Sequence, residues 1–373
     1  IYNDYTHTNG NLVANSAANS FTVVGDVVLN GGNMFNSGSA PSGAHTYGSL
    51  TIASGGTYKA TSGTTTITSE KASSGFAWKN EETDGTGFAH NNGTVTITTG
   101  ATTHIMESSF YNLTINQSGQ NFYWRDSAGA LLTIHNDLSV TGNFYRNTAG
   151  DTLTVTGDVT IPNNGVIGQA SESGANNFGS LTIESGGTYV ATSGTTTLTA
   201  YSGNGSNSDE SRCFHNNGTF THNKGKVKTT DDHQQQIFCQ VATTFYDLET
   251  ANGAPDVDDS LYFRLNGDNY LTILNDFTVT GGNVRFYNAD RGITVRGNTF
   301  IGASGRISEQ ELTGGTIIHD GLITNKGVFL TSSTTNNFNG GVRNLGTFTS
   351  DDTITIGGTG GILEGNLDDA NVN

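Results

Sequence analysis

Hydrophobic and polar residues alternate along most of this chain with a period of two. Leu50 and Ile52 flank the polar Thr51, and the same order recurs in residues 95–97 (VTI) and in many other short β-branched runs. Such alternation is typical of a β-strand that buries one face. Gly-Gly, Asn-Gly and Ser-Gly pairs separate the runs and supply the positive φ that tight corners need. Because no apolar residues recur with a helical period, the pattern predicts an all-β protein with essentially no helix.

The sequence also repeats itself at a longer distance. The stretch Gly48–Thr68 recurs almost unchanged as Gly179–Thr199. Together with other matched segments, it defines long repeats at about 18–150 and 151–290, followed by a divergent part at 291–373. We expect Leu50, Ile52 and Ile67 to lie in the core. The positions at which the two stretches differ in character should face outward, namely Ala53/Glu184 and Lys59/Val190.

Short strands with corners at about 20 residues per circuit predict a β-solenoid, in which each coil pairs in parallel with the next. A β-sandwich is the main alternative, since it too consists of many short strands. We favour the solenoid because the spacing exceeds that of hairpins, and because identical residue types recur at coil spacing as stacked ladders require. We therefore expect residues 1–373 to form one continuous β-solenoid.

Three segments resemble the repeats of large β-solenoid proteins from bacterial surfaces and phage fibres: GGTYxATSGTTTxT, FYNLTI and LTIxNDLxVTGN. The resemblance covers nearly the whole chain. It implies a right-handed parallel β-helix and a location outside the cell, on its surface or on a virion. It transfers no catalytic residue, because these motifs describe coil corners and core ladders.

The charge and hydropathy of the chain argue against two kinds of partner, nucleic acids and membranes. The formal net charge is −17, and the 16 Lys and Arg residues form no cluster. This argues against nucleic-acid binding, which depends on concentrated cations. No apolar run reaches the roughly 18 residues that a membrane-spanning helix needs, so we expect no membrane insertion.

The termini favour self-association. The chain begins IYNDYTHTNG, so we expect either a removed leader or a longer polypeptide. Neither terminus offers an amphipathic helix to cover the unpaired backbone of a terminal coil. Either the solenoid continues in a longer polypeptide, or its terminal coils pair with another copy, which would produce a homo-oligomer or a filament.

Aromatic–arginine segments are the most conspicuous candidate site. FYWRD (122–126) aligns with LYFRL (261–265), and NFYR (143–146) and VRFYN (284–288) follow one coil later. We favour a ladder of rings that braces the solenoid. The alternative is a surface on which rings beside Arg stack on a polysaccharide or a cell-surface glycan. Such a carbohydrate site would comprise Tyr123, Trp124, Arg125, Tyr145, Tyr262, Arg264 and Tyr287.

The two cysteines, Cys213 and Cys239, lie 26 residues apart, which is close to one coil. Equivalent side chains on adjacent coils stack about 4.8 Å apart, within the reach of a disulfide. The spacing leaves two alternatives open, a disulfide or two buried thiols.

No pattern points to catalysis or to a tightly held metal. A glycosidase needs two carboxylates that converge across a cleft, whereas sequence neighbours on an extended chain diverge. His90 and His215 both precede Asn-Asn-Gly, which we interpret as corners. We expect no cofactor, and loop carboxylates leave weak Ca²⁺ binding open. The adjacent carboxylate pairs are Glu81-Glu82, Asp231-Asp232, Asp258-Asp259, Asp351-Asp352 and Asp368-Asp369.

The sequence thus predicts a non-catalytic structural module of an extracellular fibre, filament or virion appendage, with self-assembly as a further expectation. A carbohydrate-binding adhesin that uses the aromatic–arginine coils is the alternative. A polysaccharide-cleaving β-helix enzyme is less favoured, because the charged residues are scattered. Any specific activity is expected where the long repeats diverge, in residues 70–89, 201–214 and 251–260, and along the aromatic coils.

Overall fold

The computed structural model is a parallel β-solenoid of about 13 turns and confirms the predicted fold class. All described elements are strands. A turn takes about 23 residues rather than 20. The sequence separation between residues in register on adjacent turns varies from 18 (Val95 and Leu113) to 33 (Leu181 and Phe214). Loops between fixed strands take up such insertions. The structure describes residues 1–14, 16–35, 40–82, 86–106, 108–125, 131–202, 211–230, 233–253, 260–266, 269–287, 292–309, 315–331, 335–350, 353–357, 362–365 and 371–372.

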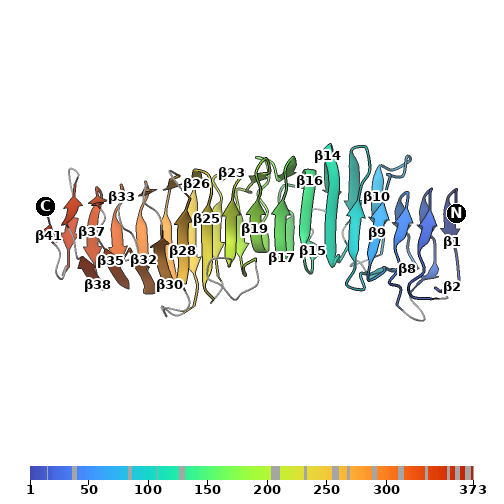
Figure 1. Cartoon of the computed structure of the whole chain (residues 1–373), viewed down its shortest axis with the longest axis horizontal. Coiled ribbons are helices and arrows are strands. Elements are labelled where there is room, and N and C mark those ends of the chain that lie inside the picture. The colour runs from blue at the N-terminus through green and yellow to red at the C-terminus, as the bar shows by residue number, and fades with distance from the viewer. Residues whose placement is uncertain are drawn as a thin grey trace. The chain divides into compact units, whose positions relative to one another are not determined.

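The first compact unit comprises Ile1–Ala175 and Gly186–Tyr189. Its strands lie side by side in successive parallel turns (Figure 1). They are β1 (Tyr5–His7), β2 (Asn11–Leu12), β3 (Phe21–Val23), β4 (Val27–Leu29), β5 (Gly32–Met34), β6 (His45–Tyr47), β7 (Leu50–Ile52), β8 (Gly56–Lys59), β9 (Thr64–Ile67), β10 (Phe76–Asn80), β11 (Phe88–Ala89), β12 (Thr94–Ile97), β13 (Thr103–Met106), β14 (Asn112–Arg125), β15 (Leu131–Ile134), β16 (Leu138–Arg146), β17 (Thr152–Ile161), β18 (Gly165–Ile167) and β20 (Thr188–Val190).

The second unit comprises Asn176–Ser185 and Val190–Asn373 and has the same parallel pairing. A separate seven-stranded sheet runs from β26 through β41. The strands of this unit are β19 (Asn176–Ile183), β21 (Thr195–Leu198), β22 (Arg212–Asn216), β23 (Thr219–Thr221), β24 (Lys226–Thr229), β25 (Gln235–Cys239), β26 (Thr243–Phe245), β27 (Asp247–Ala251), β28 (Ser260–Leu265), β29 (Leu271–Ile273), β30 (Phe277–Tyr287), β31 (Ile293–Val295), β32 (Thr299–Ser308), β33 (Thr316–His319), β34 (Ile323–Asn325), β35 (Val328–Thr331), β36 (Thr335–Phe338), β37 (Gly341–Asn344), β38 (Thr347–Ser350), β39 (Thr353–Ile356), β40 (Ile362–Glu364) and β41 (Asn371–Val372).

Inward-facing residues stack in register and form the core. Within the first unit, one column takes a fully buried side chain from each of five strands, and burial of each such side chain stabilises the fold by about 1.5–3 kcal/mol. The column is Tyr47, Ile67, Ile97, Ile115 and Val140. Leu50 and Ile52 are also fully buried, as predicted. The divergent positions Ala53, Lys59, Glu184 and Val190 are half-buried or exposed, also as predicted.

Hydroxyl side chains form an outward-facing column on the same strands of the first unit. The column is Thr22, Thr46, Thr66, Thr96, Thr114, Ser139 and Thr160. At the matching positions of the second long repeat, Lys228, Glu249, Thr278 and Phe300 lie in register. The two repeats therefore share the register of these strands, while charge and size vary on the outward side. The inward column changes as well, with Thr229 and Thr250 at the positions of Ile97 and Ile115.

This comparison predicts that the outward hydroxyls can be exchanged at little cost. Thr96→Lys combined with Thr114→Glu copies the registered Lys228–Glu249 ion pair (Nζ–Oε1 2.9 Å). We expect the free energy of unfolding to change by no more than about 0.5 kcal/mol, as for most surface substitutions. Urea unfolding measures the change, and inward Ile97→Lys serves as the disruptive control. A loss as large as that of the control would show that the hydroxyls are needed for the fold.

Candidate functional site

Four rings from consecutive turns of the first unit form a surface ladder, which we name the aromatic column: Phe76, His104, Tyr123 and Tyr145. They project from β10, β13, β14 and β16, and all four are half-buried. Neighbouring ring centroids lie 5.6, 5.5 and 5.8 Å apart, in order along the column. These distances are typical of favourable aromatic pairs.

The surroundings of the aromatic column favour the neutral forms of His104 and Tyr145. Burial, followed by the nearby Arg125 charge, lowers the pKa of His104. Burial, followed by the neighbouring Tyr123 and Glu172, raises the pKa of Tyr145. Each interior ring of the column also lies between two ring neighbours, so its faces are largely covered. This arrangement supports the bracing role that the sequence favoured.

The structure distributes the predicted sugar-contacting residues of the first unit over both sides of the sheet. Tyr123 and Tyr145 belong to the aromatic column, and Arg125 is exposed beside it. Trp124 is fully buried, so including it in a surface site was wrong. Adjacent residues on a strand point to opposite faces, and sequence alone did not fix which of the two faced outward. Phe76 and His104 were missed. Period-two alternation of β13 places His104 outward, whereas Phe76 faces outward only because the register shifts between Phe76 and Trp78.

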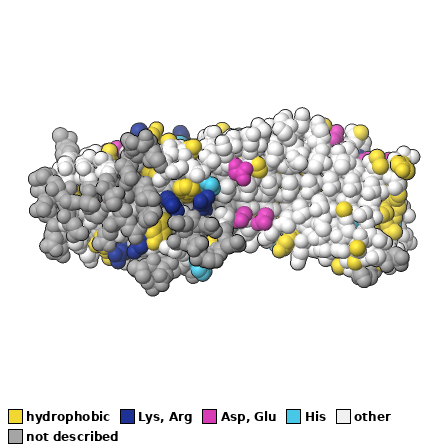
Figure 2. Space-filling view, viewed as in Figure 1, with side chains coloured by type: hydrophobic (Ala, Val, Ile, Leu, Met, Phe, Trp, Pro, Cys, Tyr) yellow, Lys and Arg dark blue, Asp and Glu magenta, His cyan; other side chains and the backbone are white. Residues whose placement is uncertain are grey.

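In the second unit, Arg side chains contact the aromatic rings at the matching positions. Tyr262 and Arg264 are half-buried on β28. Arg285 donates to the Tyr262 hydroxyl (3.0 Å) and lies 5.6 Å from the centroid of its ring. The guanidinium groups of Arg212 and Arg264 lie 4.5 and 5.6 Å from the Phe238 ring centroid. Figure 2 likewise shows Lys and Arg side chains beside hydrophobic and His side chains. The Tyr287 side chain is outside the described residues.

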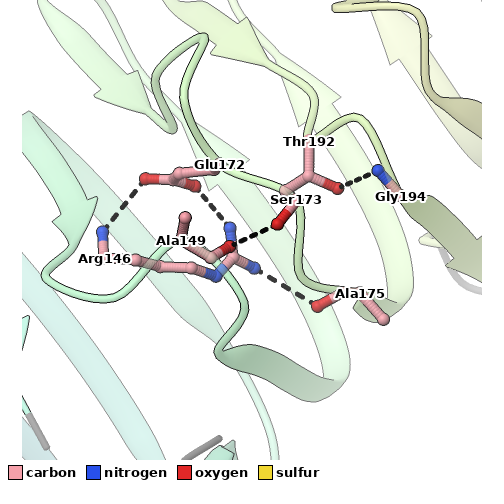
Figure 3. Close-up of polar contacts among 7 residues, drawn as sticks. All are labelled: Arg146, Ala149, Glu172, Ser173, Ala175, Thr192 and Gly194. Atoms are coloured by element: carbon pink, nitrogen blue, oxygen red, sulfur yellow. Dashed lines mark hydrogen bonds and ion pairs between the residues drawn. The ribbon is translucent and has the colours of Figure 1, made fainter. Parts of the chain in front are cut away.

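A buried ion pair, Arg146–Glu172, is the most unusual polar feature of the first unit (Figure 3). The two side chains are only 5% and 1% exposed. The Arg146 backbone N–H donates to Glu172 Oε1 (3.0 Å), its Nη1 donates to Oε2, and its Nη2 donates to the Ala175 carbonyl (3.3 Å). Burial raises the pKa of the Glu172 carboxyl, and the Arg146 charge opposes that rise.

The position of this pair indicates a structural role. Arg146 occupies the inward side of β16, where the second long repeat places the buried Phe286. The pair ties the end of β16 to the loop that carries Glu172, 26 residues further along the chain. Sequence analysis missed it, because Arg146 was grouped with the aromatic–arginine segments and Glu172 lies outside the matched segments. With both groups enclosed, a substrate has no surface by which to reach them.

The predicted carboxylate pairs form no described catalytic site. Glu81 forms an ion pair with Lys79, and Glu82 accepts a hydrogen bond from the Gly55 backbone. The four aspartate pairs lie outside the described residues. Among the residues that the structure describes, no group of three or more His, Cys, Asp or Glu side chains is placed to hold a metal ion. The same part of the chain contains no helix long and apolar enough to cross a membrane.

The cysteines are two buried thiols, not a disulfide. Cys239 lies in register with Asn216, and a register shift between Arg212 and Phe214 displaces Cys213. Three residues of strand correspond to roughly 10 Å, which is beyond the reach of a disulfide. The Cys213 thiol instead donates to the Gln236 carbonyl (3.3 Å), and burial raises the pKa of Cys239 to about 12.

The chain bends after both His90 and His215, as predicted, but the two histidines differ in their contacts. Nδ1 of His90 accepts the Asn92 backbone N–H (3.0 Å), which closes a turn with positive φ at Asn92. The same bond joins His222 to the Lys224 backbone N–H (3.0 Å). His215 instead lies within β22 and stacks on Phe238. The corner that matches His90 is therefore HNKG at His222. The sequence comparison instead aligned His90 with His215, because Asn-Asn-Gly follows both.

Comparisons with known proteins gave no match: no family model fits the chain, and no curated protein or solved structure is significantly similar to it. The resemblance to bacterial-surface and phage solenoids therefore rests on the sequence motifs alone, while the solenoid fold is shown by the structure.

Proposed function

We propose that this chain is a non-catalytic structural module of an extracellular fibre, filament or virion appendage, and that it self-associates. The observation that supports this most is the stacking of inward residues turn after turn, as in the column from Tyr47 to Val140. Each interior strand bonds to the strands before and after it, which gives a stiff and cooperative array.

The outer surface is consistent with this role. The outward column from Thr22 to Thr160 carries only hydroxyl groups, and most of the described surface in Figure 2 is neither charged nor hydrophobic. A net charge of −17 favours solubility of such a surface.

Electron microscopy and sedimentation velocity of the purified protein test this proposal. We expect regular oligomers or filaments whose abundance rises with protein concentration. A monodisperse monomer at high concentration would contradict self-association. Release of reducing sugars from a polysaccharide panel would contradict a non-catalytic role.

A carbohydrate-binding adhesin is the second candidate, and Tyr145 favours it. Phe144 is in register with Ile167 of the next turn. The residue that follows the register beside Tyr145 is therefore Gly168. Since glycine has no side chain, it leaves the last ring of the aromatic column a face on which a sugar can stack.

Tyr145→Ala should therefore weaken binding of a neutral oligosaccharide such as cellohexaose. We expect a loss of about tenfold, the equivalent of one ring–sugar contact of about 1.4 kcal/mol. Isothermal titration calorimetry measures it. Tyr111→Ala is the matched control, because Tyr111 is also half-buried but stacks on His90, outside the aromatic column. Equal affinities for the two variants would exclude the column as the sugar site.

A further inference from the structure

A groove lies on the outer face of β4, β7 and β10 in the first unit. The outward residues of these strands, Val28, Thr51 and Lys79, lie in register. Between β9 and β10 the chain leaves the ladder and returns through an antiparallel bridge, Lys71–Phe76. The Ser74 and Gly75 backbone N–H groups both donate to the Lys71 carbonyl (2.9 and 2.7 Å), which fixes the turn. We name residues 68–75 the overhang.

The overhang partly covers this face. Thr51 points away from the core, since its neighbours Leu50 and Ile52 are the inward pair, yet it is only 7% exposed. Beside it remains an open hollow of about 260 Å³. That is slightly smaller than the roughly 300–1,000 Å³ of typical small-molecule sites. Its polar lining comprises Asn30, Lys71, Ser73, Ser74, Lys79 and Glu81.

The overhang arises where the long repeats diverge. In the second unit, an antiparallel bridge Ser202–Arg212 forms at the matching point, since Phe76 and Arg212 each begin the strand that follows. The segments enclosed by the two bridges differ in length and sequence. The solenoid fold thus tolerates segments of different length and sequence at this point. The residues that line the groove are therefore not required for the fold and can serve binding.

The groove has a charge opposite to that of the whole chain. It contains two ammonium groups and one carboxylate, in a chain of net charge −17. Glu81 is paired with Lys79, so the second ammonium, on Lys71, gives the lining a net charge of +1. A ligand that complements this groove therefore carries an anionic group.

The remaining lining groups are those that recognise hydroxyls. Ser73 and Ser74 contribute hydroxyls, and Asn30 contributes an amide that can both donate and accept. The Ser74 Oγ is buried and has no hydrogen-bond partner among the described residues. A buried hydroxyl left without a partner is costly, so rotation of the Ser74 side chain toward the hollow would let it gain a hydrogen bond from a bound ligand.

We propose that this groove binds an acidic saccharide, namely an oligosaccharide that contains uronic acid. Its carboxylate pairs with Lys71, and its hydroxyls bond to Ser74 and Asn30. Two features distinguish it from the aromatic column: it needs no ring stacking, and it selects for charge. The inference goes beyond the structural role proposed above and does not depend on it.

Trigalacturonic acid and its methyl ester are the matched probes, because they share hydroxyls and differ in charge. Isothermal titration calorimetry of the full chain at low ionic strength should show binding of the acid, with the ester at least tenfold weaker. Lys71→Gln should weaken binding of the acid by about tenfold, as expected for one charged hydrogen bond. Ser74→Ala should weaken it severalfold.

Lys59→Gln is the matched control for charge. Lys59 lies on β8, outside the groove lining, and the second long repeat has Val190 in its place, so the fold tolerates a neutral residue there. We expect this variant to bind like the wild type. Absence of acid binding at millimolar concentration would overturn the proposal, and so would equal affinity for acid and ester. Equal losses of affinity in the Lys71 and Lys59 variants would also overturn it, because the net charge of the protein would then explain the binding.

Discussion

Glu172→Ala should lower the free energy of unfolding of the first unit by about 3–5 kcal/mol, the cost of leaving one member of a buried ion pair without its partner. Arg146 would then keep its charge while 5% exposed, and it would lose both of its hydrogen bonds to the Glu172 carboxylate. Urea unfolding followed by tryptophan fluorescence reports on this unit specifically, because both tryptophans, Trp78 and Trp124, are buried in it.

A double variant separates burial of charge from loss of packing. Arg146→Phe combined with Glu172→Leu removes both charges and places at residue 146 the side chain that the second repeat has at Phe286. Replacing a buried ion pair by hydrophobic residues is often neutral or stabilising. We expect stability within about 1 kcal/mol of the wild type. If the double variant is as unstable as Glu172→Ala, the ion pair is not the source of the loss.

His319 should make the second unit sensitive to acid. Its ring lies in a column between Val295 and Phe338 and is fully buried, with Nδ1 bonded to the Thr299 hydroxyl (2.7 Å). Burial lowers the pKa of His319 to about 3. Below the ordinary histidine pKa of about 6.5, the unfolded chain therefore binds a proton that the folded chain does not. Stability should fall as the pH drops from about 6.5 towards 3, by about 1.4 kcal/mol per pH unit at most.

His319→Leu should remove this component. At pH 4.5 the wild type should have lost about 2–3 kcal/mol from this residue relative to pH 7, and the variant should not show that loss. Leucine suits the apolar column, so the variant should fold at neutral pH. Thermal unfolding by circular dichroism across this pH range gives the comparison. His135→Gln, which changes an exposed ring, should retain the wild-type pH dependence. Equal slopes for wild type and His319→Leu would contradict the assignment.

Period-two alternation predicted the fold well because most of the described strands follow it, as Leu131–Ile134 and Leu138–Arg146 do. Leu50, Ile52 and Ile67 are buried as expected, and the divergent positions of the long repeats face outward. The coil length was underestimated, because the clearest short spacings came from turns with few inserted residues. Parallel pairing followed from the repetition of residue types at coil spacing, which a sandwich does not require.

Details that depend on register could not be read from the sequence. The strands of the two cysteines pair residues 24 and then 23 apart (Arg212 with Gln236, Phe214 with Ile237), so Cys213 is out of line with Cys239, 26 residues away. Likewise, a shift of one residue decides whether Trp124 or Tyr123 faces outward. The groove and the Arg146–Glu172 pair depend on where loops fold back, which alternation does not describe. The region around residues 70–89 was nonetheless singled out by its divergence between repeats, and part of the proposed groove lies there.

The in-register parallel ladder is the central claim, and an engineered cross-link tests it most directly. Thr66 and Thr96 are 30 residues apart in sequence but in register on β9 and β12, so their Cα atoms should lie about 4.8 Å apart. Thr66→Cys with Thr96→Cys should form a disulfide on mild oxidation, detected by mass spectrometry of the unreduced peptides. Thr66→Cys with Thr98→Cys, two positions out of register, should not. Cross-linking of the second pair in preference to the first, or of neither, would contradict the solenoid register.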